Sequence, residues 1–181
     1  RIRAYNPDAR LIFLFRDPVD LAWSEWRMGY ALGWETSNFA AAIRGGRERI
    51  RTLPSLAFGR RFYAYIERGY YASQVARALA LFPRSQLLFL LSDDLRDRQE
   101  ETLLRISGFL GIASFPAMLP KRENASNGIA YPASPTLADL DHFCAVLGED
   151  LWQFAALTGV DIADWTMALR LGERSGAGNR A

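Results

Sequence analysis

Lysine, cysteine and histidine each occur only once in the 181 residues of this sequence. Because Cys144 has no second cysteine to pair with, an internal disulfide is excluded, and a zinc site would lack its usual ligands. This cysteine usage fits a reducing compartment, so we expect a cytoplasmic protein without a bound metal. No apolar run approaches the roughly 20 residues that a membrane-spanning helix needs. The net charge of +2 is too small to indicate a nucleic-acid-binding protein.

The single lysine also excludes one way of binding phosphate. All other basic side chains in the sequence, apart from one histidine, are arginines. Lys121 is preceded by Pro120 and followed by Arg122. A glycine-rich phosphate loop that ends in Gly-Lys-Ser or Gly-Lys-Thr is therefore absent from these residues.

The most informative segment is residues 11–28, LIFLFRDPVDLAWSEWRM. Its first residues, LIFLF, are apolar and aromatic-rich, which is typical of a strand buried on both faces. Asp17 can cap a helix whose first turn includes Pro18, so a helix is predicted to follow the strand at once. Arg16 then lies at the carboxyl end of a buried strand, where open α/β sheets bind their ligands. An arginine at this place, eight residues before Ser24, is suited to bind a phosphate or sulfate group.

Residues 16–24, RDPVDLAWS, resemble a motif of the sulfotransferase family, especially of its bacterial members and of the heparan sulfate enzymes. The family motif is R-[DN]-P-V-[DE]-R-[AY]-x-S, and Leu21 replaces its second arginine. Three further blocks resemble the family in the same order and at suitable spacing: RGYY at residues 68–71, FPRSQLLFLLSDDL at residues 82–95 and FLGI at residues 109–112. The resemblance extends from about residue 6 to residue 165.

The resemblance implies an enzyme that transfers a sulfuryl group from PAPS (3′-phosphoadenosine 5′-phosphosulfate) to a hydroxyl or amine of a small-molecule or carbohydrate acceptor. Arg16 and Ser24 occupy the positions at which the family binds the 3′-phosphate of PAPS. The family binds the 5′-phosphosulfate with an earlier loop of approximately GxxKGGTT sequence, so we expect that loop and the general base upstream of Arg1. The full-length protein would then be the enzyme, and this fragment alone is expected to be inactive.

The same resemblance implies further cofactor-binding residues. Tyr70 belongs to the family's RGxY block and is a candidate for the cofactor cleft, although a tyrosine beside a glycine kink could equally belong to the core. A long loop is expected over residues 115–135, where the family has a phosphate-contacting loop of S-K-G-R-x-[YH]-P type. Four candidates lie in this loop: Lys121, Arg122, Ser126 and Gly128. The last two follow the shape of the family loop, and the first two would supply the basic residues that it lacks here. A solvated polar loop is the alternative.

The expected fold is a three-layer α/β domain of the P-loop type, in which helices flank a parallel sheet and of which this chain supplies a part. Half of the residues are hydrophobic, so a chain of this length can bury a core in one domain. We expect that domain over residues 1–168 and a flexible tail over residues 169–181. A second strand is predicted over residues 86–91, followed by a turn. Helices are predicted near residues 18–32, 38–50, 60–82 (with a break at Gly69), 98–110, 136–147 and 149–157.

Roles that involve no ligand are also open for the two phosphate-binding candidates. Arg16 could pair with a neighbouring carboxylate, and Ser24 could be a packing or surface residue. The chain could then be a non-catalytic nucleotide-binding or degenerate P-loop-type module, and a nucleotide kinase relative is a third hypothesis.

No nucleophile is evident beside His142, and we expect no catalytic role for it. Met28 replaces a histidine that lies near the acceptor in the heparan sulfate enzymes, so their acceptor chemistry is not expected here.

Overall fold

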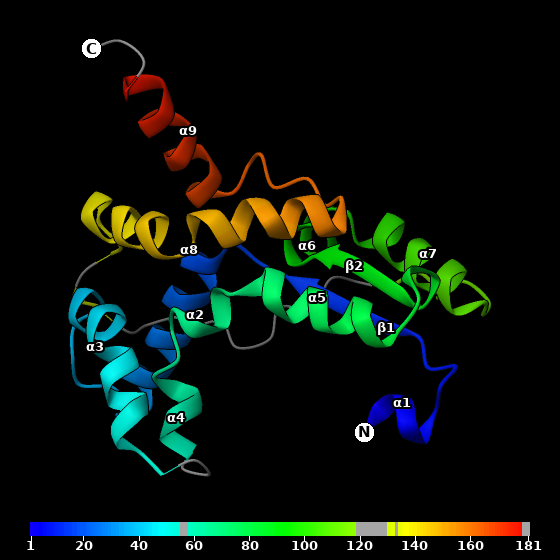
Figure 1. Ribbon diagram of the computed structural model, residues 1–181, viewed down its shortest axis with the longest axis horizontal. Coiled ribbons are helices and arrows are strands. Elements are labelled where there is room, and N and C mark those ends of the chain that lie inside the picture. Colours follow the sequence, from blue (N-terminus) through cyan, green and yellow to red (C-terminus); the bar gives the residue numbers. More distant parts are fainter. Residues whose placement is uncertain (55–57, 119–129, 133, 179–181) are drawn as a thin grey trace. The chain divides into compact units, whose positions relative to one another are not determined.

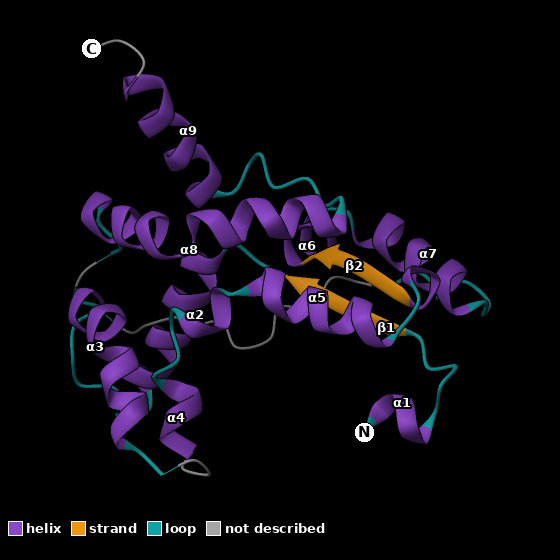
Figure 2. Cartoon of the chain, viewed as in Figure 1, coloured by secondary structure: helices purple, strands orange, loops and turns teal. Residues whose placement is uncertain are grey.

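The computed structural model describes residues 1–54, 58–118, 130–132 and 134–178. Figure 1 colours the chain by position in the sequence, and Figure 2 colours it by secondary structure. The chain divides into two compact units, each of which collects segments that are distant in the sequence. The first unit contains Arg1–Arg16, Ala72–Ala125 and Phe154–Val160, and the second contains Asp17–Tyr71, Ser126–Gln153 and Asp161–Ala181. The boundary after Arg16 falls inside the RDP sequence, so this motif contributes to both units.

A two-stranded parallel sheet is the centre of the first unit among its described residues. Strand β1 (Leu11–Phe15) pairs with β2 (Leu87–Leu91), and Phe15 is the register partner of Leu91. Parallel neighbours require a long crossover connection, and helices lie between these two strands in the sequence. The parallel sheet with helical connections confirms the predicted α/β class.

The two faces of β1 differ in exposure. Phe15 is buried, whereas Ile12 and Leu14 are 40% and 51% exposed. Successive side chains of a strand point to opposite faces, so one face of β1 packs in the core while the described residues leave the other open. The prediction that LIFLF is buried on both faces is therefore wrong for β1. Because every residue of this strand is apolar, its pattern could not distinguish one covered face from two.

Aromatic rings fill the core of the first unit beside the sheet. The ring centroid of Phe15 lies 4.6 Å from that of Phe154 and 6.1 Å from that of Phe89. Phe13 adds a further contact, with its centroid 5.6 Å from that of Phe89. Tilted and edge-on pairs of this kind contribute about 0.5–1.5 kcal/mol each beyond their burial. The residue that directly precedes Arg16 is therefore fixed by core packing.

Two helices follow β2 in the first unit, α6 (Ser92–Asp97) and α7 (Gln99–Leu110). The turn predicted after β2 is thus the start of a short helix. Helix α7 ends as predicted, because Gly111 has φ of 70°, the left-handed conformation that glycine adopts after helices. The remaining elements of this unit are α1 (Ile2–Tyr5), η2, a 3₁₀ turn over Arg84–Gln86, and all but the first residue of α5 (Tyr71–Leu81).

The second unit is helical in its described residues. Its elements are α2 (Pro18–Ala31), α3 (Phe39–Thr52), α4 (Phe58–Phe62), η1, a 3₁₀ turn over Glu67–Gly69, most of α8 (Leu137–Thr158) and α9 (Thr166–Gly178). Trp26, Phe39 and Phe143 are fully buried in its core. A single helix, α8, replaces the two that were predicted over residues 136–157. Of the helices that the structure describes, none combines the length and the apolar character of a membrane span.

The helical region predicted over residues 60–82 is divided into α4, η1 and α5, with a break at Gly69 as expected. A Cβ atom added to Gly69 would lie 2.5 Å from Leu147 Cδ1 and 3.2 Å from Pro18 Cβ. Only a glycine permits so close an approach. The next residue, Tyr70, has ψ of 77° and is no longer helical. The break therefore coincides with a place where three segments of the second unit meet.

Residues 169–178, predicted as part of a flexible tail, continue helix α9. The first turn of this helix is buried at Met167 and Ala168. The backbone N–H of Met167 also donates a hydrogen bond to the buried carboxylate of Asp17. Contacts with a residue so distant in the sequence cannot be inferred from the polar, glycine-containing composition of the tail.

Candidate functional site

The carboxyl edge of the sheet in the first unit is the first part of the candidate site. Arg16 directly follows β1, and Ser92 directly follows β2. Because the residues that precede them are register partners, Arg16 and Ser92 leave neighbouring strands at the same edge. Arg16 is half-buried at the place predicted from the sequence. This edge is where α/β sheets bind their ligands.

Ser92 was not singled out as a site residue from the sequence. Its Oγ atom is buried and has no hydrogen-bond partner among the described residues. Two acids, Asp93 and Asp94, follow Ser92 at the start of α6. Asp93 pairs with Arg96 at 2.8 Å, and Asp94 pairs with Arg98. Both carboxylates are therefore engaged by neighbouring arginines, whereas the Ser92 hydroxyl has unused hydrogen-bonding capacity.

Asp17 is a buried carboxylate that begins the second unit, with only 2% of its surface exposed. Its Oδ1 accepts a hydrogen bond from Val19 N at 2.8 Å, which caps α2 as predicted. Its Oδ2 accepts a second hydrogen bond from Met167 N, at 3.2 Å, in the first turn of α9. One carboxylate thus caps two helices. Burial raises the pKa of Asp17, although the backbone hydrogen bonds act against this shift.

Ser24 lies on α2 and is half-buried. Val19, Ala22 and Trp26 are buried and form an apolar stripe along this helix. At 100° per residue, Ser24 lies well off that stripe. Arg16 belongs to the first unit and Ser24 to the second, and their binding of a common phosphate stays a prediction.

The RGYY block packs against α2 within the second unit. Arg68 forms an ion pair with Glu25, and Gly69 lies close to Pro18 at the start of the helix. Pro18 and Glu25 are seven residues apart, so they share one face of α2, and Ser24 lies on another. The block therefore supports α2 from a face that does not carry Ser24.

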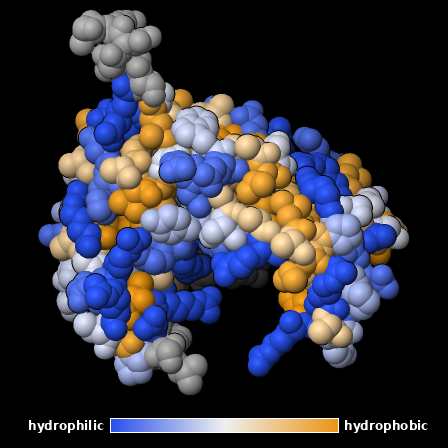
Figure 3. All heavy atoms as spheres, in the orientation of Figure 1, coloured by the Kyte–Doolittle hydropathy of each residue, from blue (hydrophilic) through white to orange (hydrophobic). Residues whose placement is uncertain are grey.

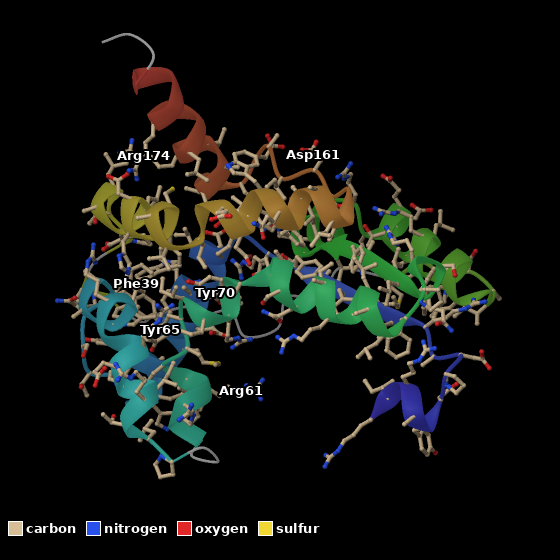
Figure 4. The ribbon with its side chains drawn as sticks, in the orientation of Figure 1. Phe39, Arg61, Tyr65, Tyr70, Asp161 and Arg174 are labelled. Carbon is tan, nitrogen blue, oxygen red and sulfur yellow. The ribbon has the colours of Figure 1, made fainter. Side chains whose placement is uncertain are left out.

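Tyr70, from the same block, was predicted to bind the cofactor. Its hydroxyl accepts a hydrogen bond from Arg47 Nη2 at 3.2 Å, and Arg47 Nε pairs with Glu67 at 2.8 Å. The hydrogen bond to Glu67 holds the pKa of Arg47 above its ordinary value. Tyr70, labelled in Figure 4, thus takes part in a polar network of the second unit. Its role in cofactor binding stays a prediction.

Glu35 is a second buried carboxylate, and it joins three segments of the second unit. It pairs with Arg49 of α3 at 2.6 Å and accepts a hydrogen bond from the Tyr65 hydroxyl at 3.0 Å. The backbone N–H groups of Thr36 and Ser37 supply two further hydrogen bonds. Burial alone would raise the pKa of Glu35, but the hydrogen bonds from Arg49, Ser37 and Tyr65 lower it overall. Glu35 is therefore an ionised structural anchor.

The arginines of α3 are neutralised by acids rather than gathered into a basic surface. Arg44 pairs with the buried Asp139 at 2.6 Å, and Arg51 pairs with Glu48 at 3.0 Å. Hydrophilic side chains predominate over the region of α3 and α4 in Figure 3.

The remaining predicted cofactor-binding residues lie outside the described part of the chain: Lys121, Arg122, Ser126 and Gly128. Tyr131, from the same predicted loop, is described and belongs to the second unit. Its ring centroid lies 6.1 Å from that of Trp23 and 6.1 Å from that of Trp26. The end of the predicted loop therefore packs on α2, the helix that carries Ser24.

Neither the single histidine nor the single cysteine has the surroundings of an activated group. Burial, together with Arg44, lowers the pKa of His142. Cys144 is buried, its thiol lies 3.7 Å from Met167 O, and burial raises its pKa. Within the described ranges, no group of three or more histidine, cysteine or acidic side chains could hold a metal ion.

These features define an α/β protein in which an arginine follows a strand at the carboxyl edge of a parallel sheet. Residues 2–125 match the family described as "Sulfotransferase domain". Since the match covers more than half of the sequence, the chain belongs to this family. No curated protein matches the chain.

A solved structure supports the same fold. The chain is similar to the sulfotransferase from Alicyclobacillus acidocaldarius, with a TM-score of 0.74 and 23% sequence identity. The similarity covers 91% of this chain and 60% of the solved chain, so the present sequence spans less than two thirds of that protein. At this level of identity the likeness concerns the fold, and it confirms the predicted α/β fold of P-loop type as a partial domain.

Proposed function

We propose that the full-length protein is a PAPS-dependent sulfotransferase in which this chain binds the 3′-phosphate of the donor through Arg16 and Ser24. The observation that carries the proposal is the position of Arg16, at the carboxyl end of β1 in a chain of the sulfotransferase family. The acceptor is a hydroxyl or amine of a small molecule or carbohydrate.

The chemistry of the residues fits this ligand. A phosphate dianion is best bound by a guanidinium that can donate two parallel hydrogen bonds, and a hydroxyl adds a directed donor without further charge. Ser92 follows β2 at the same edge as Arg16, and its Oγ, which has no hydrogen-bond partner in the described part of the chain, is a further polar group that a bound ligand could satisfy. Core packing of Phe15 holds the backbone before Arg16 in place, which reduces the entropy lost when the ligand binds.

PAPS supplies the activated sulfuryl group. The acceptor oxygen or nitrogen attacks the sulfur, the bond between sulfur and the bridging oxygen of the 5′-phosphate breaks, and adenosine 3′,5′-bisphosphate leaves. The proton of the acceptor passes to a general base, which we assign to no residue of this chain. The part of Arg16 and Ser24 is to bind and orient the donor for in-line attack.

The test is the replacement of Arg16 by alanine in the full-length protein. Calorimetry would compare the binding of adenosine 3′,5′-bisphosphate with that of adenosine 5′-phosphosulfate, which lacks the 3′-phosphate. Loss of a charged hydrogen bond weakens binding by roughly 10- to 150-fold, and we expect this loss for the bisphosphate only. The matched control is Arg77→Ala, which removes an exposed arginine from α5.

Each outcome bears on a different part of the proposal. An equal loss for both nucleotides in Arg16→Ala would reject the assignment of Arg16 to the 3′-phosphate. A wild-type protein that binds neither nucleotide would reject the donor itself and favour a non-catalytic module. Transfer of phosphate from ATP instead of sulfate from PAPS would favour the nucleotide kinase alternative.

A further inference from the structure

Arg27, on α2 three residues after Ser24, is a half-buried arginine that lies beside two aromatic rings. Its guanidinium carbon lies 5.7 Å from the ring centroid of Trp23 and 5.7 Å from that of Tyr131. All these residues belong to the second unit. The guanidinium is therefore held against two rings, one from its own helix and one from the segment over residues 130–132.

The charge of Arg27 has no acidic partner in the described ranges. Arg49 and Arg68, which are also half-buried, pair with Glu35 and Glu25. No carboxylate among the described residues pairs with Arg27, and its Nε atom is buried without a hydrogen-bond acceptor. Cation–π contacts stabilise the charge in part, but they provide no acceptor for the buried Nε–H group. A buried donor without an acceptor costs free energy, and an anionic ligand would remove that cost.

Helix geometry brings Arg27 close to Ser24. Residues three apart on a helix have their Cβ atoms about 5–6 Å from each other on adjoining parts of the surface. The long side chain of an arginine easily spans that distance, so one tetrahedral anion can contact both residues. Of the phosphate-binding candidates in the described ranges, Arg16 would balance only half of the charge of a phosphate dianion, and Ser24 adds none; Lys121 and Arg122 lie outside those ranges.

We propose that Arg27 binds the phosphate that Ser24 binds and adds a positive charge to that of Arg16. The ligand class is a phosphate monoester dianion, and this inference rests on the proposed function, in which that group is the 3′-phosphate of PAPS. The rings of Trp23 and Tyr131 lie beside the guanidinium and limit its freedom before the ligand binds. Such preorganisation increases affinity because less conformational entropy is lost on binding.

The experiment measures the discrimination between two nucleotides that differ only in the 3′-phosphate, adenosine 3′,5′-bisphosphate and adenosine 5′-phosphate. Calorimetry on the full-length protein would compare wild type with Arg27→Gln, Arg27→Lys and the control Arg77→Gln. Arg27→Gln should weaken binding of the bisphosphate roughly 10- to 150-fold and leave binding of the monophosphate nearly unchanged. Arg27→Lys should recover only part of the loss, because an ammonium group cannot donate the two parallel hydrogen bonds of a guanidinium.

The outcomes separate this inference from the function on which it rests. If Ser24→Ala loses discrimination while Arg27→Gln retains it, the role of Arg27 is overturned and the proposed function stands. If wild type itself fails to distinguish the two nucleotides, the proposed function fails. An equal loss for both nucleotides, with a lower melting temperature of the free Arg27→Gln protein, would make Arg27 a packing residue and overturn the inference. If Arg27→Gln does not fold, Arg27→Lys provides the test. A loss of affinity for the bisphosphate alone supports phosphate binding by Arg27. Unchanged discrimination between the two nucleotides rejects it.

Discussion

Replacing Asp17 by alanine should destabilise the second unit at two helix ends at once. The carboxylate accepts one hydrogen bond at the start of α2, from Val19 N, and another at the start of α9, from Met167 N. Alanine leaves both N–H groups without their acceptor. Water cannot easily replace it, because Asp17 is 2% exposed.

The expected magnitude follows from the two lost hydrogen bonds. Removal of a helix N-cap costs about 0.5–2 kcal/mol, and a buried N–H left unsatisfied costs about 1–3 kcal/mol. Since Met167 is fully buried, the two contributions together should lower the free energy of unfolding by roughly 2–4 kcal/mol. Asp17→Asn keeps one acceptor oxygen and should cost about half as much.

The pH dependence provides an independent check on the same residue. Burial raises the pKa of Asp17 above its ordinary value of 3.8, so the folded state binds this proton more tightly than the unfolded state does. The contribution of the raised pKa to stability is therefore fully present below the ordinary value and is lost as the pH rises through the folded-state pKa. The stability difference between wild type and Asp17→Asn should be larger at acidic pH than at neutral pH.

Urea unfolding followed by circular dichroism, repeated at several pH values, measures both effects. The control is Asp164→Ala, which removes an exposed aspartate near the start of α9. A free energy of unfolding for Asp17→Ala within about 0.5 kcal/mol of wild type would show that the two helix caps do not stabilise the folded protein. A difference between wild type and Asp17→Asn that grows with rising pH would refute the sign of the pKa shift.

The other predictions concern the packing of α2 and the ligand. Gly69→Ala should lower the free energy of unfolding by about 1–3 kcal/mol, because the added methyl group meets Leu147, and an unchanged melting temperature would contradict the close packing. Glu25→Gln should cost about 1–3 kcal/mol by removing the negative charge that pairs with Arg68, and a double-mutant cycle with Arg68→Met should show coupling between the two positions. Ser24→Ala should weaken adenosine 3′,5′-bisphosphate by about 0.5–1.5 kcal/mol without changing the melting temperature of the free protein; a lower melting temperature with unchanged affinity would make Ser24 a packing residue.

Local signals in the sequence were sufficient for the strand–helix unit around Arg16. The apolar run LIFLF, followed by Asp17 and Pro18, predicted a strand, a capped helix and an arginine between them, and the structure has all three. These signals involve residues within a few positions of each other, where hydrogen bonding and backbone preferences decide the conformation. The apolar stripe of α2 was predictable for the same reason.

What the sequence could not predict depends on residues that are distant in the chain. The second cap made by Asp17 involves Met167, which is 150 positions away. The exposure of one face of β1 depends on which elements cover the sheet. The sequence of an all-apolar strand does not show whether one or both of its faces are buried. The surroundings of Arg27 depend on Tyr131, whose position follows from tertiary packing. The burial of the Ser92 hydroxyl and the position of Ser92 at the same sheet edge as Arg16 likewise depend on tertiary packing and on the register of the two strands.

The most direct test of the central claim is a sulfuryl-transfer assay with the full-length protein and PAPS labelled in its sulfate group. Incubation with a panel of phenols, sugars and amines should give a labelled acceptor and adenosine 3′,5′-bisphosphate in equal amounts. Arg16→Ala should reduce the rate with PAPS at subsaturating donor, whereas Arg77→Ala should not. The claim would be contradicted if wild type transferred no label to any acceptor and bound adenosine 3′,5′-bisphosphate no more tightly than adenosine 5′-phosphate.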